Sequence, residues 1–262
     1  MNPHAVFFDI DGTLWDRYNF IPDSTRQAIK KLKANGHLAF INTGRTRGYV
    51  TNPDLLSLGF DGIVCGCGTM VEYKGDIIFL HEIDNELLAN MISLMRDFGM
   101  KPIIEGKKYL YMEEADFIDD PYGKKLMSEL KDARRSIDEC WGKWNGSKVS
   151  CEMDGCDYER CFSILSNDFD ALVHNPHVAE IVPCGFTKGT GIKKVCEYLG
   201  IDLEDTVAIG DSVNDIEMLK TAGKSVAMGS GSDDAKNIAT YVTTPLLEDG
   251  IYNALVHLGL IE

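Results

Sequence analysis

The segment Ala5–Thr13, AVFFDIDGT, decides the fold, because an apolar run ends there abruptly at two carboxylates. The uninterrupted apolar run from Ala5 to Phe8 is typical of a central parallel strand that is buried on both faces. Asp9 and Asp11 follow two residues apart, so in an extended chain both side chains point to one side of the strand's carboxyl end. Ligands of open α/β sheets bind beyond these strand ends, and paired carboxylates suit a hard cation such as Mg²⁺. A strand that ends in an ordinary Asp-Gly turn is equally compatible with this segment alone.

Composition limits the classes of partner. The 262 residues are enough for one large or two medium domains, and the apolar content of 44% is ordinary for a globular protein. The 41 acidic side chains exceed the 26 basic ones, and the net charge of −15 repels nucleic-acid backbones and anionic membranes. We therefore expect neither nucleic acid nor a membrane as a partner. A small anionic substrate would need a local cation or a metal ion to reverse the field at its site.

The amino terminus and the cysteines indicate a compartment. The segment MNPHAVFF lacks the basic region of a secretory signal, and no apolar stretch reaches the length of a membrane span. These features predict a cytoplasmic protein, in which the eight cysteines are expected to be reduced and mostly buried. The pair Cys65 and Cys67 and the series Cys151, Cys156 and Cys161 lack the spacing of a zinc site.

The two ends of the chain alternate buried strands with helices, the pattern of a doubly wound, mostly parallel, Rossmann-like α/β sheet. In the segment 21–36, for example, Ala28, Ile29 and Leu32 share one helix face and Gly36 supplies the stop. The strands expected in this core span residues 5–8, 38–41, 62–65, 70–73, 77–80, 206–209, 225–228 and 241–243, and the helices 21–36, 191–199 and 251–258.

The middle of the chain has a different order of elements: helix, paired strands, helix, strand, helix, paired strands. Such a unit can fold as an inserted α/β domain. Its expected helices span residues 84–98, 122–136 and 158–165, and its expected strands 103–105, 109–112, 149–153, 171–174 and 178–182. We expect a core domain of residues 1–81 and 184–262 and an inserted domain of residues 82–183.

Four polar clusters follow strands of the core or precede one of its helices. They are Asp9 with Asp11, the segment Asn42-Thr43-Gly44-Arg45, Lys188, and the segment Gly210-Asp211-Ser212-Val213-Asn214-Asp215. Each has an ordinary explanation when taken singly. Lys188 could be a solvated residue before a helix and Thr43 an N-cap, while Asp211 and Asp215 could be carboxylates that favour a helix start. Taken together, the four clusters are much more specific than any one of them.

This set of motifs resembles the haloacid dehalogenase superfamily of phosphohydrolases. DIDGT is similar to its first motif, NTGR to its second, Lys188 in TKGTGI to its third and GDSVND to its fourth. The resemblance spans the whole chain. The long insert between the second and third motifs, with the EDG at Asp249, resembles the Cof-like branch, which has a large α/β cap and many sugar phosphatases. The sequence departs from that branch at Cys67-Gly68-Thr69, where Asn-Gly-Ala is common, and this change could alter the floor of the substrate site.

The resemblance implies a Mg²⁺-dependent phosphatase that acts on a small phosphorylated metabolite, first of all a sugar phosphate. Asp9 would be the nucleophile that forms an aspartyl-phosphate, and Asp11 would be the general acid and base. Thr43 would bind a phosphoryl oxygen, and Lys188 would offset negative charge. The implied Mg²⁺ ligands are Asp9, the backbone carbonyl of Asp11, Asp211 and Asp215, and the implied substrate-binding residues are Gly44, Arg45 and Asn214. Arg45 could instead pair only with nearby acids.

Two other functions remain compatible with the sequence. A phosphomutase of similar architecture would use the same aspartyl-phosphate but would yield an isomerised sugar phosphate instead of inorganic phosphate. A non-catalytic sensor would bind a phosphorylated ligand and relay the movement of the cap to a partner. Such a sensor would not need both a nucleophile at Asp9 and an acid/base at Asp11.

Overall fold

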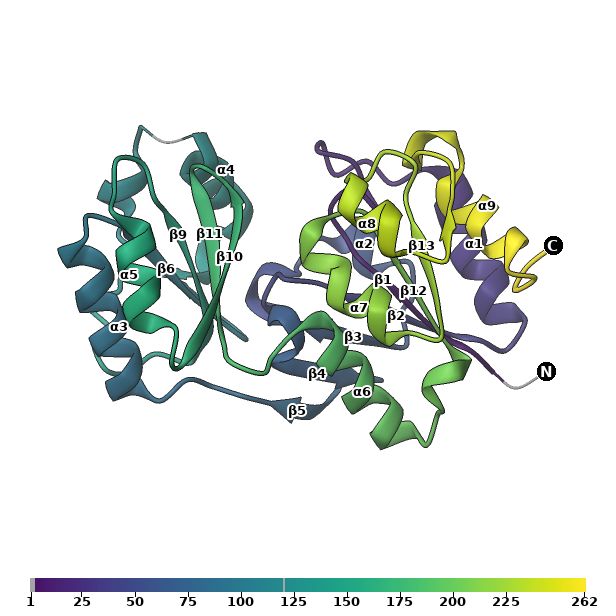
Figure 1. Ribbon diagram of the computed structural model, residues 1–262, viewed down its shortest axis with the longest axis horizontal. Coiled ribbons are helices and arrows are strands. Elements are labelled where there is room, and N and C mark those ends of the chain that lie inside the picture. Colours follow the sequence, from purple (N-terminus) through teal and green to yellow (C-terminus); the bar gives the residue numbers. More distant parts are fainter. Residues whose placement is uncertain (1–2, 120) are drawn as a thin grey trace. The chain divides into compact units, whose positions relative to one another are not determined.

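The computed structural model describes residues 3–119 and 121–262 and contains two compact units (Figure 1). The core unit comprises residues 1–44, 52–80 and 186–262, and the insert unit comprises residues 45–51 and 81–185. The segment Arg45–Thr51, which lies within the range 1–81 expected for the core domain, clusters with the insert unit. The predicted α/β class, with a mostly parallel core sheet, is confirmed.

The core unit is built on an eight-stranded sheet in the order β14-β13-β12-β1-β2-β3-β4-β5. Its strands are β1 (Ala5–Phe8), β2 (Leu38–Asn42), β3 (Gly62–Cys65), β4 (Met70–Tyr73), β5 (Asp76–Leu80), β12 (Thr206–Gly210), β13 (Lys224–Ala227) and β14 (Tyr241–Val242). β1 lies parallel to both neighbours, with Phe8 opposite Ile209 on β12 and Ile41 on β2. All four residues of β1 are fully buried, as the apolar run predicted. β4 pairs antiparallel with both β3 and β5, which confirms the predicted hairpin.

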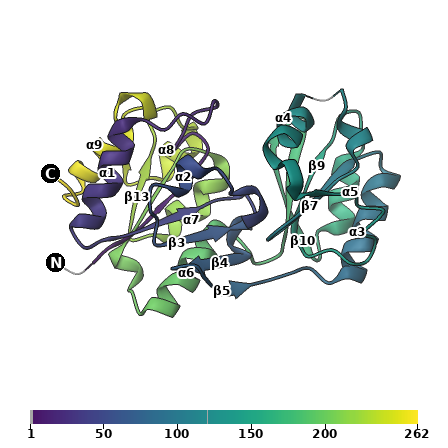
Figure 2. The ribbon, with the colours of Figure 1, turned by 180° about the vertical axis from the view of Figure 1, so that it is seen from behind.

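Helices lie on both faces of the core sheet (Figures 1 and 2). They are α1 (Asp23–Ala34), α2 (Pro53–Leu56), α6 (Lys188–Leu199), α7 (Ile216–Thr221), α8 (Asp233–Ile238) and α9 (Gly250–His257). α1 buries Ala28, Ile29 and Leu32, the predicted face. α6 begins at Lys188 and not at residue 191, because Thr187 and Thr190 form a capping box at its start. The sequence did not predict α2, α7 or α8, since four to six residues are too few to show a helical period.

The insert unit contains a six-stranded sheet in the order β10-β11-β9-β6-β7-β8. Its strands are β6 (Lys101–Gly106), β7 (Leu110–Tyr111), β8 (Arg134–Arg135), β9 (Gly146–Glu152), β10 (Phe169–Asn175) and β11 (Val178–Pro183), and its helices are α3 (Asn85–Asp97), α4 (Pro121–Leu130) and α5 (Tyr158–Leu165). α3 and α5 pack on the sheet through a shared core that includes Met91, Cys161 and Val149. Figure 2 shows both helices beside this sheet.

The predicted helix 122–136 is wrong at its carboxyl end. α4 ends at Leu130, a 3₁₀ turn follows, and Arg134–Arg135 then forms β8, with Arg134 opposite Leu110 of β7. Leu126 and Leu130 share a buried cluster with Leu110, so the helix is held against the strand that β8 joins. Tertiary pairing here overrides the local helix pattern.

Arg45–Thr51 joins the insert unit through polar contacts. Thr46 Oγ1 donates a 3.3 Å hydrogen bond to Glu105 of β6, and the Tyr49 hydroxyl donates one of 2.8 Å to Glu129 of α4. Both acceptors are more than 50 residues away along the chain, so local sequence pattern could not have revealed this association.

Two sequence predictions concern the whole molecule. The eight cysteines of the described residues are thiols outside any disulfide, and Cys65, Cys67, Cys151, Cys161 and Cys196 are buried. Within residues 3–119 and 121–262, every helix is too short or too polar to cross a bilayer.

Candidate active site

Three carboxylates and one ammonium group meet at the carboxyl ends of β1 and β12. Asp9 follows β1, Asp211 follows β12, and Asp215 ends the 3₁₀ turn that comes next. One oxygen of each lies within 4.8 Å of the others. Lys188 Nζ, at the start of α6, is 2.6 Å from Asp9 Oδ1 and 2.6 Å from Asp215 Oδ1. The structure thus brings together residues from three of the four predicted polar clusters.

Asp215 organises the loop after β12. Its Oδ2 accepts hydrogen bonds from the backbone amides of Asp211 at 2.8 Å and Ser212 at 3.0 Å, while its Oδ1 contacts Lys188. Asn214 Oδ1 accepts from Ser212 Oγ at 2.7 Å and from Lys188 Nζ at 3.2 Å. The loop is therefore tied to the same ammonium group that contacts Asp9.

Two glycines allow the start of α6 to approach β3 closely. A Cβ on Gly68 would lie 2.4 Å from the Thr187 carbonyl oxygen, and a Cβ on Gly191 would lie 2.3 Å from Val64 Cγ1. Asn42 Nδ2 of β2 also donates a 3.0 Å hydrogen bond to the carbonyl oxygen of Lys188. None of these three contacts is visible in a linear motif.

The turn after β1 contacts the side chain of Asp211 through Thr13 and Gly12. Thr13 Oγ1 donates a 2.8 Å hydrogen bond to Asp211 Oδ1. A Cβ on Gly12, whose φ is +86°, would lie 2.4 Å from Asp211 Oδ2, so only glycine fits there. Asp11 accepts a hydrogen bond at Oδ1 from Trp15 Nε1 at 2.9 Å. No role was predicted for Thr13, Trp15, Asn42 or Ser212, because their contacts depend on how the loops fold.

The electrostatics of the cluster show an excess of negative charge. Burial raises the pKa of Asp9 well above its usual range, with Lys188 opposing and Asp215 and Asp211 adding to the rise. Burial, then Asp215, raises the pKa of Asp211 to about 7, although the Thr13 hydrogen bond opposes this. Burial lowers the pKa of Lys188, but Asp215 and Asp9 outweigh it and raise that pKa above its ordinary value. One ammonium group therefore does not balance the carboxylates.

The donor set fits a hard divalent cation. Asp9, Asp211 and Asp215 offer only oxygen ligands, which Mg²⁺ prefers, and their spacing allows one ion to contact all three. Burial, together with repulsion between the carboxylates, raises the pKa values of Asp9 and Asp211, and a cation would stabilise their ionised forms. The residues present therefore fit a bound metal ion.

The remaining predicted residues lie at the end of β2 and beyond it. Thr43 is buried; its amide donates a 2.9 Å hydrogen bond to Val64, and its carbonyl accepts one of 3.2 Å from the Cys67 amide. Gly44 is the last residue of the first segment of the core unit, residues 1–44. Arg45 lies in the insert unit, with Nη1 3.7 Å from Glu129. Arg45 thus pairs with an acid, an arrangement that is compatible with both roles considered for it.

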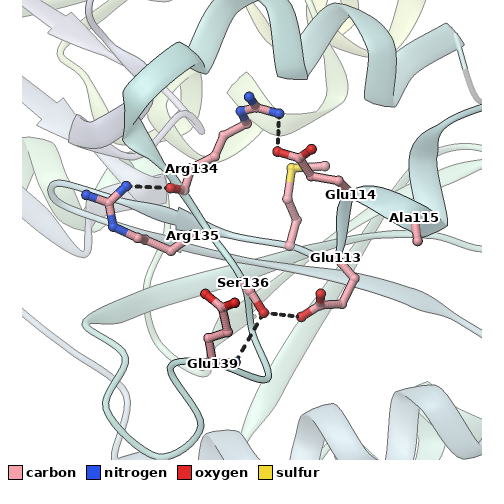
Figure 3. Close-up of a pocket in the computed structure, with 8 residues that line it drawn as sticks. Glu113, Glu114, Ala115, Arg134, Arg135, Ser136 and Glu139 are labelled. Atoms are coloured by element: carbon pink, nitrogen blue, oxygen red, sulfur yellow. Dashed lines mark hydrogen bonds and ion pairs between the residues drawn. The ribbon is translucent and has the colours of Figure 1, made fainter.

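A cavity of about 380 Å³ lies in the insert unit (Figure 3). Its lining residues are Met112, Glu113, Glu114, Ala115, Arg134, Arg135, Ser136 and Glu139. Arg134 pairs with Glu114, and Ser136 Oγ donates a 2.9 Å hydrogen bond to Glu113. Arg134 and Glu114 already neutralise each other and Arg135 donates to the carbonyl of Asp132, so this cavity is a weaker candidate site than the carboxylate cluster of the core unit.

Comparison with known proteins identifies the family. Residues 6–255 match the model of the haloacid dehalogenase-like hydrolases. The chain is 31% identical to YkrA of Bacillus subtilis (strain 168), over 100% of both chains. It is 26% identical to YitU of the same organism, a 5-amino-6-(5-phospho-D-ribitylamino)uracil phosphatase, over 95% of each chain. The solved structure of the HAD subclass IIB sugar phosphatase BT4131 matches with a TM-score of 0.85 and 29% identity, over 98% of this chain and 100% of that one. The fold, the sequence motifs and these matches agree: the chain belongs to the haloacid dehalogenase-like hydrolases.

Proposed function

We propose that the protein is a Mg²⁺-dependent phosphatase that hydrolyses a small phosphorylated metabolite through an aspartyl-phosphate on Asp9. The observation that carries this proposal is the buried Asp9 carboxylate in contact with Lys188, beside Asp211 and Asp215. The similarity to the sugar phosphatase BT4131 and to YitU, a phosphatase of a phosphoribityl compound, supports small phosphorylated metabolites as the substrate class. Sugar phosphates are therefore the first compounds to test.

Charge neutralisation and positioning must supply most of the catalysis, because the negative charge of a phosphate ester repels nucleophiles. In the first half-reaction the Asp9 carboxylate attacks phosphorus and the ester oxygen leaves with a proton from Asp11. In the second, water attacks the same phosphorus, gives a proton to Asp11, and Asp9 leaves as a carboxylate. Thr43 donates a hydrogen bond to a phosphoryl oxygen, and Lys188 stabilises the charge that gathers beside Asp9.

Asp9, Asp211 and the backbone carbonyl of Asp11 would hold the Mg²⁺, with Asp215 in support. A bound Mg²⁺ would supply charge neutralisation at the phosphoryl oxygens and a fixed orientation of the phosphate. Both oxygens of Asp215 already have partners in the protein: Oδ2 accepts from the loop amides and Oδ1 accepts from Lys188. We assign it mainly to the support of Asp211 and Lys188.

Removal of divalent cations should stop phosphate release, and Mg²⁺ should restore it. A chelator-treated sample is assayed for inorganic phosphate before and after the addition of Mg²⁺ or Zn²⁺. Because a ligand that binds only the folded state stabilises it, saturating Mg²⁺ should also raise the melting temperature of the wild-type protein. Asp211→Asn should lose most of that rise. Full activity in excess chelator, or recovery with Zn²⁺ but not Mg²⁺, would contradict the proposed oxygen-ligand site.

Asp11→Asn should slow substrates with poor leaving groups most. General acid catalysis is worth about 10²–10⁴ in rate, and an alkoxide needs the proton far more than a phenolate does. We expect a loss of that size for a sugar phosphate and a much smaller loss for an aryl phosphate in steady-state assays. Equal losses on both kinds of ester would remove the acid/base role from Asp11.

We also propose that residues 82–183 form a cap that selects the substrate. The proposed catalytic residues and metal ligands all belong to the core unit. Chemistry and selectivity would then reside in different units, and a closed cap would exclude water from the reacting phosphate. Product analysis separates this phosphatase from a phosphomutase, since only the former releases inorganic phosphate as its main product.

A further inference from the structure

We infer that Trp15 is a positioning residue that decides which carboxyl oxygen of Asp11 transfers the proton; this inference rests on the proposed phosphatase function. The indole Nε1–H of Trp15 donates a 2.9 Å hydrogen bond to Asp11 Oδ1. Both residues belong to the core unit and to the loop that follows the proposed nucleophile, Asp9. The bond therefore joins the proposed acid/base to a side chain that has no reacting group of its own.

The backbone of the loop places Trp15 beside Asp11. The amides of Leu14 and Trp15 donate to the Ile10 carbonyl at 2.9 and 3.2 Å, and the Gly12 amide donates to the Trp15 carbonyl at 2.9 Å. Asp11 and Trp15 thereby form an isolated β-bridge. These backbone hydrogen bonds hold Asp11 and Trp15 beside each other, which allows their side chains to meet.

Trp15 and Asp11 differ in how deeply their side chains are buried. Trp15 is only 3% exposed, whereas Asp11 is exposed. A close-packed indole cannot swing without displacing its neighbours, so the N–H of Trp15 stays at a fixed position. Trp15 is therefore the fixed partner, and its hydrogen bond limits the rotation of the Asp11 carboxyl group. Misplacement of a reacting group by about 1 Å can cost about 10²-fold in rate, so this restriction matters for catalysis.

The chemistry of the indole group assigns the oxygen. An indole N–H donates a hydrogen bond but cannot accept one. The carbonyl oxygen of a carboxylic acid is a better acceptor than its hydroxyl oxygen, so in the acid form of Asp11 the Trp15 hydrogen bond favours Oδ1 as the carbonyl oxygen and the proton on Oδ2. In the first half-reaction the O–H bond at Oδ2 breaks as the proton passes to the leaving ester oxygen. In the second, the attacking water gives a proton to Oδ2, which regenerates the acid form.

A purely structural role for Trp15 is the competing explanation, since any buried indole needs an acceptor for its N–H. Trp144 offers the matched control. It is 1% exposed, and its Nε1–H donates a 3.1 Å hydrogen bond to the Ile137 carbonyl within the insert unit. Trp144→Phe therefore removes a comparable buried hydrogen bond without touching Asp11, and Trp15→Phe removes the one that contacts it.

The test compares Trp15→Phe with Trp144→Phe on an alkyl phosphate and on p-nitrophenyl phosphate. Trp15→Phe should lose at least about tenfold more activity on the alkyl ester, because only that leaving group depends on the proton. Trp144→Phe should affect both esters equally. In an Asp11→Asn background, Trp15→Phe should cost nothing further, because it acts through Asp11. Equal losses on the two esters, or additive losses in the double variant, would overturn the positioning role.

A measurement on the folded protein without substrate covers the case in which Trp15→Phe fails to fold. The chain has three tryptophans, so ¹⁵N-labelled indoles give few resonances to assign. Asp11→Asn should shift the Trp15 indole N–H resonance and leave that of Trp144 in place. An unmoved Trp15 resonance would refute the contact.

The failure of the proposed function and the failure of the Trp15 role can be told apart. If the wild-type protein releases phosphate from neither ester, the proposed function is wrong, and the role of Trp15 with it. If the wild type is active but Trp15→Phe loses equal activity on both esters, only the role of Trp15 is wrong.

Discussion

Asp9→Asn should reduce phosphate release by at least about 10⁴-fold, since loss of a covalent nucleophile removes the reaction path itself. The amide keeps the shape of the side chain but lacks a nucleophilic oxygen and a charge for the metal ion. The fold should survive. Burial and the neighbouring carboxylates raise the pKa of Asp9, which means that its ionised form is unfavourable in the metal-free folded state. The melting temperature of metal-free Asp9→Asn should therefore be no lower than that of the wild type.

Asp16→Asn is the matched control for this substitution. Asp16 lies in the same loop, and its Oδ1 accepts hydrogen bonds from the amides of Tyr18 and Phe20 at 2.8 and 2.9 Å. An asparagine oxygen can accept both bonds, so this variant should keep the wild-type rate. Both proteins are assayed for phosphate release and followed by thermal unfolding. Substantial turnover by folded Asp9→Asn would show that Asp9 is not the nucleophile.

Lys188→Met should damage both stability and catalysis. Lys188 is 1% exposed, and its ammonium group contacts Asp9 and Asp215. Removal of one partner from a buried ionic cluster costs about 3–5 kcal/mol, because the remaining charges stay buried without compensation. The loss of preorganised positive charge beside the reacting phosphate should lower kcat by a further 10²–10³-fold or so. Denaturant unfolding and steady-state kinetics, recorded where the variant is still folded, measure the two effects separately.

The chain supplies a control for the stability part of this effect. Lys148 of β9 is also 1% exposed, and its Nζ lies 3.4 Å from Glu105 and 2.6 Å from Glu180. Lys148→Met should therefore destabilise the insert unit by a comparable amount. Its folded form should still hydrolyse an aryl phosphate, because this lysine is outside the proposed catalytic site. If the two variants lose similar activity at equal folded fraction, the electrostatic role of Lys188 is wrong.

The parts of the fold that the sequence predicted are those specified by local pattern. The apolar run at residues 5–8 needs burial on both faces, and only the centre of a parallel sheet provides it. Asp9 and Lys188 are 179 residues apart, yet topology brings them together. Asp9 follows a parallel strand, and Lys188 begins the helix that leads back to the parallel strand β12, so both lie at the carboxyl edge of the sheet. The sequence thus indicated the main members of the site through topology.

The features that the sequence did not predict depend on contacts between distant segments or on loop closure. β8 has only two residues and exists because β7 offers an edge to pair with. Arg45–Thr51 clusters with the insert unit through acceptors on β6 and α4. The hydrogen bond from Trp15 to Asp11 requires a specific turn at Gly12, and no periodicity encodes that turn.

The stereochemical course at phosphorus tests the central claim most directly. A phosphate ester made chiral at phosphorus with oxygen isotopes is hydrolysed by the Mg²⁺-loaded wild-type enzyme, and the configuration of the released phosphate is determined. Attack by Asp9 followed by attack of water is two in-line displacements, each of which inverts the phosphorus centre. We therefore expect overall retention of configuration. Overall inversion would mean that water attacks the ester directly, and it would contradict the aspartyl-phosphate on Asp9.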